Sequence, residues 1–246
     1  MTATPKPADT RRLYQQVADR IRAVIHEGQF GVGSRLPPER ELALQLGVSR
    51  PSLREALIAL EIDGQVEIRM GSGVYVCSPQ ASAERDTPAL GESPTELMQA
   101  RATLEGAVVA LAAARVTRAG LDRVAESLAA MKREHARGRM PVDADRRFHL
   151  GIAEMCGNSV LVRMVGELFD GRHSPISSRM SGRAETVQTW TVALAEHERI
   201  YRALEARDPQ AATAAMFTHL RASEERWVSE PASPPEPPSP FDKDRP

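Results

Sequence analysis

Residues 34–76, SRLPPERELALQLGVSRPSLREALIALEIDGQVEIRMGSGVYV, carry the clearest local structure signals in the chain. Pro37 and Pro38 favour the start of a short helix, because proline is tolerated in a first helical turn. Gly47 interrupts the apolar pattern of that helix, and Ser49 stands where the N-cap of a second helix belongs. After the second helix, polar and apolar residues alternate on either side of a glycine-rich turn, which predicts a two-stranded hairpin.

Another helix is expected before this stretch, because apolar residues between positions 13 and 25 recur at the spacing of one helical face. The elements then follow as helix, helix, tight turn, helix and hairpin, which is the outline of a winged helix-turn-helix. We therefore expect such a domain over residues 11–77. The apolar positions of its first helix are Leu13, Val17, Ile21, Val24 and Ile25.

The second helix of the motif has one apolar face, so its other face is available to a partner. That face carries Arg50, Ser52 and Arg54 near the helix N-terminus, the part that reaches base edges in helix-turn-helix proteins. Arginine suits guanine O6 and N7, and serine hydroxyls suit phosphates. Four arginines and two glutamates lie between Arg35 and Arg54, so we count Arg35 in a local positive face. The arrangement predicts DNA binding, whereas any one of these arginines alone is typical of a solvated helix.

The composition of the whole chain excludes several classes of protein. With 32 Lys+Arg against 33 Asp+Glu, the net charge of -1 excludes a histone-like binder, and 4% aromatic residues disfavour base stacking as the main activity. Two cysteines, Cys77 and Cys156, favour a reducing compartment over a disulfide scaffold. The N-terminal residues lack the apolar stretch of a signal peptide, and no run of 18 apolar residues occurs. We therefore expect a cytoplasmic protein with no membrane partner.

The remainder of the chain divides by composition. Residues 78–93 are polar without a sustained apolar stripe, which predicts a linker. Residues 94–228 show helical periodicity in about six segments, which predicts an all-α bundle. Residues 229–246 hold seven of the 18 prolines and almost nothing apolar, so we expect a disordered tail. The predicted fold class is mainly α: an N-terminal winged helix-turn-helix followed by an all-α helical bundle.

An arginine interrupts the apolar face of the first helix in this bundle. Arg101 lies four residues after Leu97 and three before Leu104, so its side chain points inward and must meet an anion. Glu105, at i,i+4, is one candidate partner. The carboxylate of a ligand, held by the guanidinium in a two-pronged hydrogen bond, is the other. The spacing alone favours neither.

Three later helices also carry ionisable residues where apolar side chains belong. Asp145 and His149, at i,i+4, share one helix face, and His197 and His219 lie on helices joined by a short Asp-Pro turn. A single histidine in such a place is more often a hydrogen-bonded core residue. Four converging groups can share a divalent metal, and this donor set suits zinc, with nickel or manganese as alternatives.

The N-terminal segment resembles the DNA-binding domain of the GntR family of bacterial transcription regulators. The likeness rests on PxERELA, GVSRxxLREAL and the glycine-rich wing, which occur in that order within residues 11–77. Pro38 departs from the family, which often has serine there. The resemblance implies that operator DNA is contacted by Arg40, Ser49, Arg50, Ser52, Arg54 and Gly71.

Residues 93–228 resemble the FCD effector-binding domain of FadR-type GntR regulators. The likeness rests on DADRRFHLGIAEMCGNSVL and AEHERIYRALEARDPQAATAAMFTHL. It implies that a divalent metal is held by one Asp and three His, and that a small carboxylate effector joins the metal. It also implies that Arg101 and Glu105, in an Arg-x-x-x-Glu pattern, hold the effector. The metal ligands implied by this likeness are Asp145, His149, His197 and His219.

The sequence thus predicts a homodimeric, metabolite-responsive regulator, by default a repressor, that binds a pseudo-palindromic operator in double-stranded DNA. An alternative is a metal-dependent, hydrolase-like enzyme, because an open position on a metal could activate water. No HExxH-type motif supports that alternative. Two further alternatives are a winged helix that binds protein, with a bundle that only dimerises, and a purely structural metal with Arg101 paired to Glu105.

Overall fold

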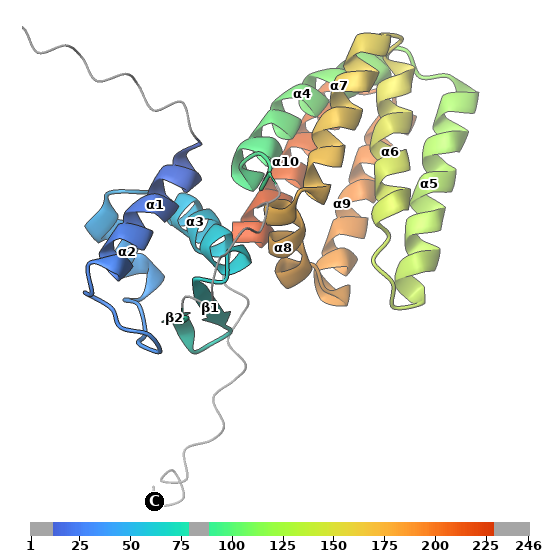
Figure 1. Cartoon of the computed structure of the whole chain (residues 1–246). Helices are drawn as coiled ribbons and strands as arrows, with labels where there is room; N and C mark the ends of the chain where they lie inside the picture. The colour runs from blue at the N-terminus through green and yellow to red at the C-terminus, as the bar shows by residue number, and fades with distance from the viewer. Residues whose placement is uncertain (1–11, 79–88, 229–246) are drawn as a thin grey trace, which may run out of the picture. The chain divides into compact units, whose positions relative to one another are not determined.

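The computed structural model describes residues 12–78 and 89–228 (Figure 1). The chain divides into two compact units at the bond between Ser93 and Pro94. The predicted tail, residues 229–246, lies outside the described residues, as does most of the predicted linker.

The first unit is a winged helix-turn-helix, as predicted. Gly47 ends the second helix with φ +66°, a backbone conformation that favours glycine. Ser49 caps the third helix and accepts a hydrogen bond from the backbone N–H of Ser52. The two strands pair antiparallel with Val66 opposite Val76. The elements are α1 (Leu13–His26), α2 (Glu39–Leu46), α3 (Arg50–Ile62), β1 (Val66–Arg69) and β2 (Gly73–Val76).

The core of this unit forms where α1, α3 and the hairpin meet. Val17 and Ile21 of α1 are buried, as their spacing predicts, but Leu13 is 50% exposed and Tyr14 is buried in its place. The Tyr14 hydroxyl donates to the backbone oxygen of Gly91 at 2.9 Å, within the same unit. Other members of this core are Leu36, Leu42, Leu53, Leu57, Leu60, Val66, Val74 and Val76.

The second unit is all-α, as predicted, but the described residues hold seven α-helices rather than about six. The additional helix is short. It starts at Pro175 after Ser174, which accepts a hydrogen bond from the backbone N–H of Ser177, and it lacks a long apolar stripe in the sequence. The elements are α4 (Pro94–Ala114), α5 (Arg118–Ala136), α6 (Val142–Met155), α7 (Ser159–Asp170), the 3-10 turn η1 (Gly171–His173), α8 (Pro175–Ala184), α9 (Val187–Glu205) and α10 (Pro209–Val228).

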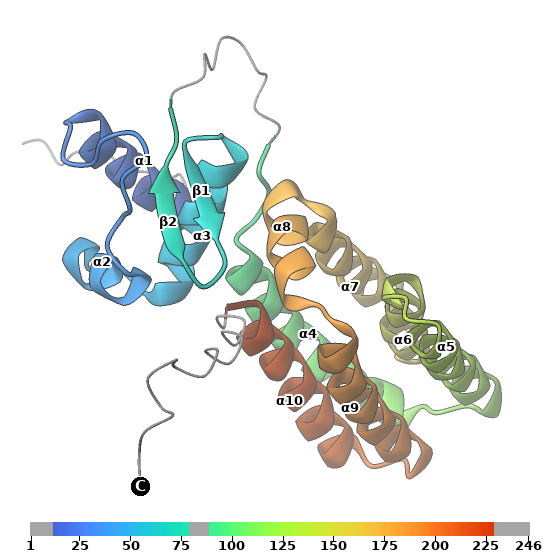
Figure 2. The same ribbon diagram turned by 90° about the horizontal axis from the view of Figure 1, so that it is seen from below.

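Helix α4 is the central helix of this unit, because it packs against α6, α7, α9 and α10. Figure 2 shows α4, α9 and α10 side by side. By length and composition α4 could also cross a membrane, but 56% of its most apolar 18-residue stretch is buried in the unit. Because α4 also carries the buried ion pair of Arg101 and Glu105, we interpret it as a core helix.

Candidate functional site

The Asp and His residues singled out in the bundle come together in the second unit. Asp145 and His149 lie on α6, His197 on α9 and His219 on α10. All of them are buried, and one possible ligand atom from each lies within 4.8 Å of the others. The group of these four side chains is called the Asp-His cluster below. Its members are close enough together to bind a single ion.

A hydrogen bond at the far side of each imidazole orients the ring toward the centre of the cluster. His149 Nδ1 lies 2.5 Å from Glu105 Oε2, and His219 Nδ1 lies 2.8 Å from Glu196 Oε2. His197 Nδ1 lies 2.7 Å from the backbone oxygen of Ala193. Since these partners accept hydrogen bonds, each Nδ1 acts as a donor. This leaves the Nε2 atoms available to a metal. In metal-binding histidines, the ring nitrogen that does not bind the metal usually donates a hydrogen bond to a carboxylate or a backbone oxygen in the same way.

Polar atoms at the centre of the cluster lack the hydrogen bonds that burial requires. Asp145 Oδ1, His149 Nε2 and His197 Nε2 are buried and have no hydrogen-bond partner within residues 12–78 and 89–228. His197 Nε2 lies 2.8 Å from Asp145 Oδ1. With Nδ1 protonated, both of these atoms are acceptors and repel each other unless a cation lies between them. An unsatisfied buried polar atom costs about 1–3 kcal/mol.

These orphaned atoms show that the cluster fits a divalent metal. Imidazole nitrogens and a carboxylate oxygen suit zinc and its first-row neighbours, and nothing in the donor set decides between zinc, nickel and manganese. The second oxygen of Asp145 accepts a hydrogen bond from Arg172 Nη1 at 3.3 Å. Arg172 in turn donates to Glu185 Oε1 at 2.6 Å, so the carboxylate of Asp145 is also held in place from outside the cluster.

Charges around His149 shift pKa values in opposite directions. Burial lowers the pKa of His149, but the nearby carboxylates of Glu105 and Asp145 outweigh burial and raise it to about 9. Burial raises the pKa of Glu105, but Arg101 and His149 lower it to about 2. Burial also opposes the ionised form of Asp145, yet the neighbouring histidines hold its pKa well below the usual value. Without a metal, His149 therefore carries a second proton between two carboxylates.

His219 differs from His149, since burial and the neighbouring His197 lower the pKa of His219 to about 3. Burial raises the pKa of Glu196, but His219 and Arg226 outweigh it and lower this pKa to about 2. At neutral pH His219 is therefore uncharged, with its Nε2 available as a ligand.

Metal binding is expected to weaken as the pH falls. Below a pH of about 9 the metal-free protein holds a proton on His149 that a metal must displace. The affinity should therefore rise about tenfold per pH unit from pH 7 to 9 and level off above, while His219 releases no proton in this range. A zinc titration against a competing chromophoric chelator at several pH values measures this slope. A flat profile between pH 7 and 9 would show that His149 is not a proton-bearing ligand.

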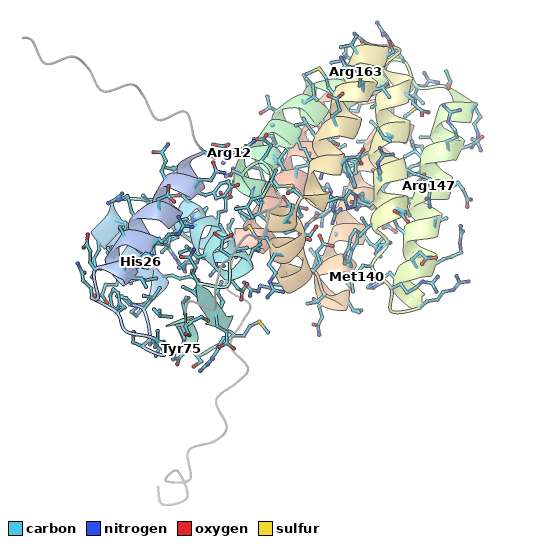
Figure 3. All side chains as sticks on the ribbon, viewed as in Figure 1. Arg12, His26, Tyr75, Met140, Arg147 and Arg163 are labelled. Carbon is cyan, nitrogen blue, oxygen red and sulfur yellow. The ribbon has the colours of Figure 1, made fainter. Side chains whose placement is uncertain are left out.

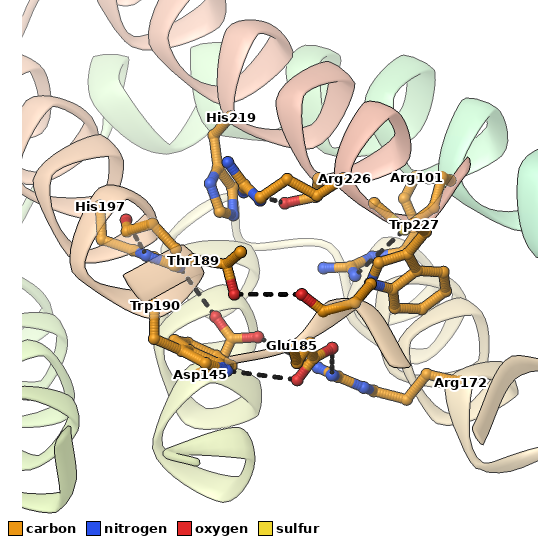
Figure 4. A pocket seen from close by; sticks show the side chains of 14 residues that line it. Arg101, Asp145, Arg172, Glu185, Thr189, Trp190, His197, His219, Arg226 and Trp227 are labelled. Carbon is orange, nitrogen blue, oxygen red and sulfur yellow. Dashed lines mark hydrogen bonds and ion pairs between the residues drawn. The ribbon is translucent and has the colours of Figure 1, made fainter. Parts of the chain in front are cut away.

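A cavity of about 50 Å³ borders the Asp-His cluster in the second unit (Figure 4). Asp145, His197 and His219 belong to both the cluster and the cavity wall. Trp190 and Trp227 supply broad apolar surface, and Thr189 and Ser223 supply hydroxyls. The arginines in the wall, which attract an anion, are Arg101, Arg172 and Arg226.

Of the two partners that the sequence left open for Arg101, the structure shows Glu105. Its Nε donates to Glu105 Oε1 at 2.7 Å. Its Nη2 is buried and has no hydrogen-bond partner among the described residues, although the side chain lines the cavity. Glu105 is not part of the cavity wall, because its other oxygen contacts His149. The pair is therefore intact, with one guanidinium nitrogen left over for a ligand.

Each arginine of the cavity wall is linked to the Asp-His cluster through a carboxylate. Arg101 contacts Glu105, which holds His149, and Arg172 contacts Asp145 itself. Arg226 binds Glu196 with two hydrogen bonds, at 2.9 and 3.0 Å, and Glu196 holds His219. The Asp-His cluster and the arginines of the cavity wall thus share one network of charges.

Several members of this network do not follow from the sequence pattern. Arg172 lies in a short turn without periodicity. Glu196 directly precedes His197, so it points away from the face that carries the histidine stripe, and it meets His219 because α9 and α10 pack together. Glu185 lies between two helices, where no stripe is defined. In the sequence, the one sign that Glu196 belongs to the site is its position next to His197, a predicted metal ligand.

Four of the DNA-reading candidates, Ser49, Arg50, Ser52 and Arg54, lie at the N-terminal end of α3, and the others lie on α2 and at the wing. Arg50 is the first residue of α3 and is exposed, as is Arg40 on α2. The Oγ atoms of Ser49 and Ser52 lie 2.8 Å apart. Ser49 is therefore partly engaged in capping the helix, whereas the exposed arginines extend the surface beside it.

Arg54 has a different environment from Arg50. Its Nη2 donates to Glu39 Oε2 at 2.8 Å, and its side chain is only 11% exposed. This ion pair connects α3 to the start of α2. The structure thus gives Arg54 a role in holding the two helices together.

The hairpin forms a wing that also carries arginines. Gly71 and Gly73 have φ values of +71° and +115°, which favour glycine. Arg35 packs against Gly73, where a Cβ would lie 2.5 Å from Arg35 Nε. Arg69, which the sequence pattern did not single out, stacks 4.4 Å from the ring centre of Tyr75. Tyr75 is labelled on the wing in Figure 3.

Comparison with known proteins gives matches along nearly the whole chain. Residues 13–76 match the family described as "Bacterial regulatory proteins, gntR family", and residues 96–222 match the "FCD domain". The Uxu operon transcriptional regulator of Escherichia coli is 36% identical over 225 residues, covering 89% of this chain and 88% of that protein. The Exu regulon transcriptional regulator of Escherichia coli is 36% identical over 222 residues, covering 86% and 83%. Among solved structures, E. coli McbR/YncC shares the fold, with a TM-score of 0.50, 22% identity and coverage of 89% of this chain and 98% of that one.

Proposed function

The chain belongs to the gntR family of bacterial regulatory proteins and carries an FCD domain, and on that basis we propose that it is a repressor released from operator DNA by a small carboxylate bound beside a divalent metal. It is a transcription regulator and not an enzyme, because its domains and relatives are those of regulators. We assign DNA binding to residues 11–77, linkage to residues 78–93, and effector binding and dimerisation to residues 94–228. We expect the protein in the cytoplasm, where its DNA lies.

One observation supports the effector proposal above all others: Arg101, whose Nη2 is buried and has no hydrogen-bond partner among the described residues, lines a cavity that shares residues with the Asp-His cluster. A buried guanidinium donor without an acceptor favours a ligand that brings one, and a carboxylate does so with good geometry. A divalent metal held by Asp145, His149, His197 and His219 would supply positive charge and an open coordination position to the same carboxylate.

The remaining residues of the cavity orient the ligand and restrict water. Arg101 binds one edge of the carboxylate, and the two tryptophans cover its carbon chain. Arg172 and Glu196 hold Asp145 and His219 in position through the hydrogen bonds described above. Regulation additionally requires that the ligand binds the DNA-releasing arrangement more tightly than the DNA-bound one.

On the DNA side, we propose that a homodimer places one α3 helix in each of two successive major-groove faces. The operator should then be a pseudo-palindrome with half-sites about 34–36 Å apart, or a multiple of one helical turn. We assign base and phosphate contacts to the exposed arginines and to the serines at the start of α3. The proposed DNA-contacting set is Arg35, Arg40, Ser49, Arg50, Ser52 and Gly71, together with Arg54, which would have to leave its ion pair with Glu39 to reach DNA.

Replacing Arg50 by alanine should weaken specific operator binding by about 1–3 kcal/mol, because a base-reading arginine would be lost. The melting temperature should not change, since Arg50 is exposed. Gel shift and footprinting with the DNA that flanks the gene measure the effect, and wild-type affinity should fall steeply with salt. Arg163→Ala, an exposed arginine in the other unit, is the matched control. An unchanged footprint for Arg50→Ala would contradict the proposed reading helix, and the absence of any shift for the wild type would favour a protein-binding wing.

Organic acids are expected to raise the melting temperature of the metal-loaded protein and to release its DNA. The same acids should have no effect after the metal is removed with a chelator, because metal and cavity share residues. A thermal-shift screen of small mono- and dicarboxylates, followed by a gel shift with each positive acid, makes this test. If no acid shifts the metal-loaded protein, the metal is structural and the sensing proposal fails.

A further inference from the structure

The three residues that precede α4 pack on the first unit. Gly91, Glu92 and Ser93 belong to that unit, although the chain continues from them directly into α4, and they are called the strap below. The Tyr14 hydroxyl donates to the backbone oxygen of Gly91. Burial raises the pKa of Tyr14 despite the nearby guanidinium of Arg12, so the hydroxyl stays protonated as a donor. Gly91 has a φ of +97°, which favours glycine.

A second contact joins the strap to α3, the proposed reading helix. Ser93 Oγ donates to Glu55 Oε1 at 2.9 Å, and the two residues are only 6% and 2% exposed. A buried carboxylate needs hydrogen-bond donors, and the loss of a buried hydrogen-bond partner costs about 1–3 kcal/mol. Glu55 lies on the same helix as Arg50. The strap therefore contacts the helix that carries the proposed DNA-reading arginine.

An ion pair at the surface also holds the strap. Arg12 donates from Nε to Glu92 Oε2 at 2.7 Å and from Nη2 to Glu92 Oε1. This hydrogen-bonded pair lowers the pKa of Glu92. A two-pronged arginine–carboxylate pair has a defined geometry, although an exposed pair adds little stability. Arg12, labelled in Figure 3, is the N-cap residue of α1. All three residues of the strap are thus held by side chains of α1, its N-cap or α3.

These contacts determine how much chain separates the reading helix from α4. With the strap in place, Glu55 holds Ser93, and α4 begins at the next residue, Pro94. If the strap left α1 and α3, the connection would run from the end of β2 at Val76 to Pro94. Once one DNA-binding unit of a dimer is bound, a longer connection lowers the effective concentration of the other unit at its half-site.

We propose that the strap keeps the connection between the reading helix and α4 short, and thereby makes operator binding depend on the spacing of the half-sites. This inference rests on the proposed function, since it requires a homodimer on a pseudo-palindromic operator. When the strap is released, the two DNA-binding units act more independently. The spacing of the half-sites then matters less.

Two insertions of the same four residues, Gly-Ser-Gly-Ser, test this proposal. One insertion, placed after Ser93, lengthens the connection between the strap and α4. The other, placed between Ala83 and Glu84, lengthens the chain before the strap. The metal-loaded full chain is titrated in gel shifts against the operator found by footprinting and against a copy with about half a helical turn, or about 5 bp, added between the half-sites.

We expect the wild type to bind the natural operator about tenfold or more tightly than the lengthened copy. The insertion after Ser93 should lower this ratio at least threefold. The insertion between Ala83 and Glu84 should leave it unchanged, because the strap still fixes the start of α4. An unchanged melting temperature shows that both units remain folded.

Tyr14→Phe combined with Ser93→Ala removes two contacts of the strap without lengthening the chain. This double variant should also lower the ratio at least threefold. Tyr201→Phe combined with Ser127→Ala is the matched control, because Tyr201 lies on α9 and Ser127 is a buried serine on α5 that donates to a backbone oxygen. The control should keep the wild-type ratio.

Equal effects of the two insertions would overturn the proposal, since the strap would then not be held on the first unit. A wild type that binds both operators equally, or a folded double variant with the wild-type ratio, would overturn it too, while the proposed function stands. If the double variant does not fold, the two insertions decide, because they leave the residues of the strap and their partners unchanged. A wild type that shifts no DNA would remove both the proposed function and this inference.

Discussion

Replacing His197 by alanine is expected to cost the protein its metal. His197 is fully buried and is one of the four proposed ligands, so the affinity should fall by more than the 10–100-fold that loss of an outer partner typically causes. Zinc at about 100 times its Kd would stabilise the wild type by about 2.7 kcal/mol. For a chain of this size that is a rise in Tm of roughly 5–10 °C, and the variant should show none of it. Metal analysis after dialysis and melting curves with and without zinc measure both effects.

His135→Ala is the matched control for this prediction. His135 lies on α5, contacts Thr191 and is not a member of the Asp-His cluster. It should keep one metal per chain. Glu196→Gln should give an intermediate loss of about 10–100-fold, because it weakens the hydrogen bond that orients His219. Wild-type zinc affinity in His197→Ala would show that the four side chains do not form one site.

Replacing Arg101 by glutamine should abolish the response to carboxylates while the metal stays bound. The variant loses the guanidinium group and with it the unpartnered Nη2, which should weaken acid binding by about 2 kcal/mol or more, or about 30-fold. A glutamine amide can still donate to Glu105, so the hydrogen bond between Glu105 and His149 should survive. Calorimetry with an acid found in the screen and metal analysis of the same sample measure the two effects separately.

Arg123→Gln serves as the control for Arg101→Gln, since Arg123 is 58% exposed on α5 and paired with Glu154. Undiminished acid binding by Arg101→Gln would assign Arg101 to its ion pair with Glu105 alone. Loss of metal together with loss of acid binding would show that Arg101 acts through Glu105 and His149 rather than on the ligand.

Local residue patterns were sufficient to predict most of the first unit. Its helices begin and end at residues whose effect is local: Ser49 caps a backbone N–H three residues later, and Gly47 adopts a left-handed conformation. These sequence signals span four or five positions. Patterns of this range do not specify what a side chain meets across the domain. Arg54 follows Arg50 by four residues and lies on the same face of α3, yet its guanidinium is paired with Glu39. This ion pair forms only when α3 packs on α2, so the local pattern does not show it.

The candidate metal site shows the same division. Helical periodicity identified Asp145, His149, His197 and His219, because an ionisable residue in an apolar stripe is visible without a fold. Periodicity could not identify Glu196, Arg172 or Glu185. Glu196 lies outside the apolar face of its helix, Arg172 lies in a short 3-10 turn, and Glu185 lies between two helices. These residues join the site through contacts between elements distant along the chain. The amino-acid sequence thus specified that the four side chains of the Asp-His cluster would be buried, and helix packing specified their partners and buried further polar residues such as Glu196 and Arg172, because helical periodicity is local whereas pairing depends on which helices meet.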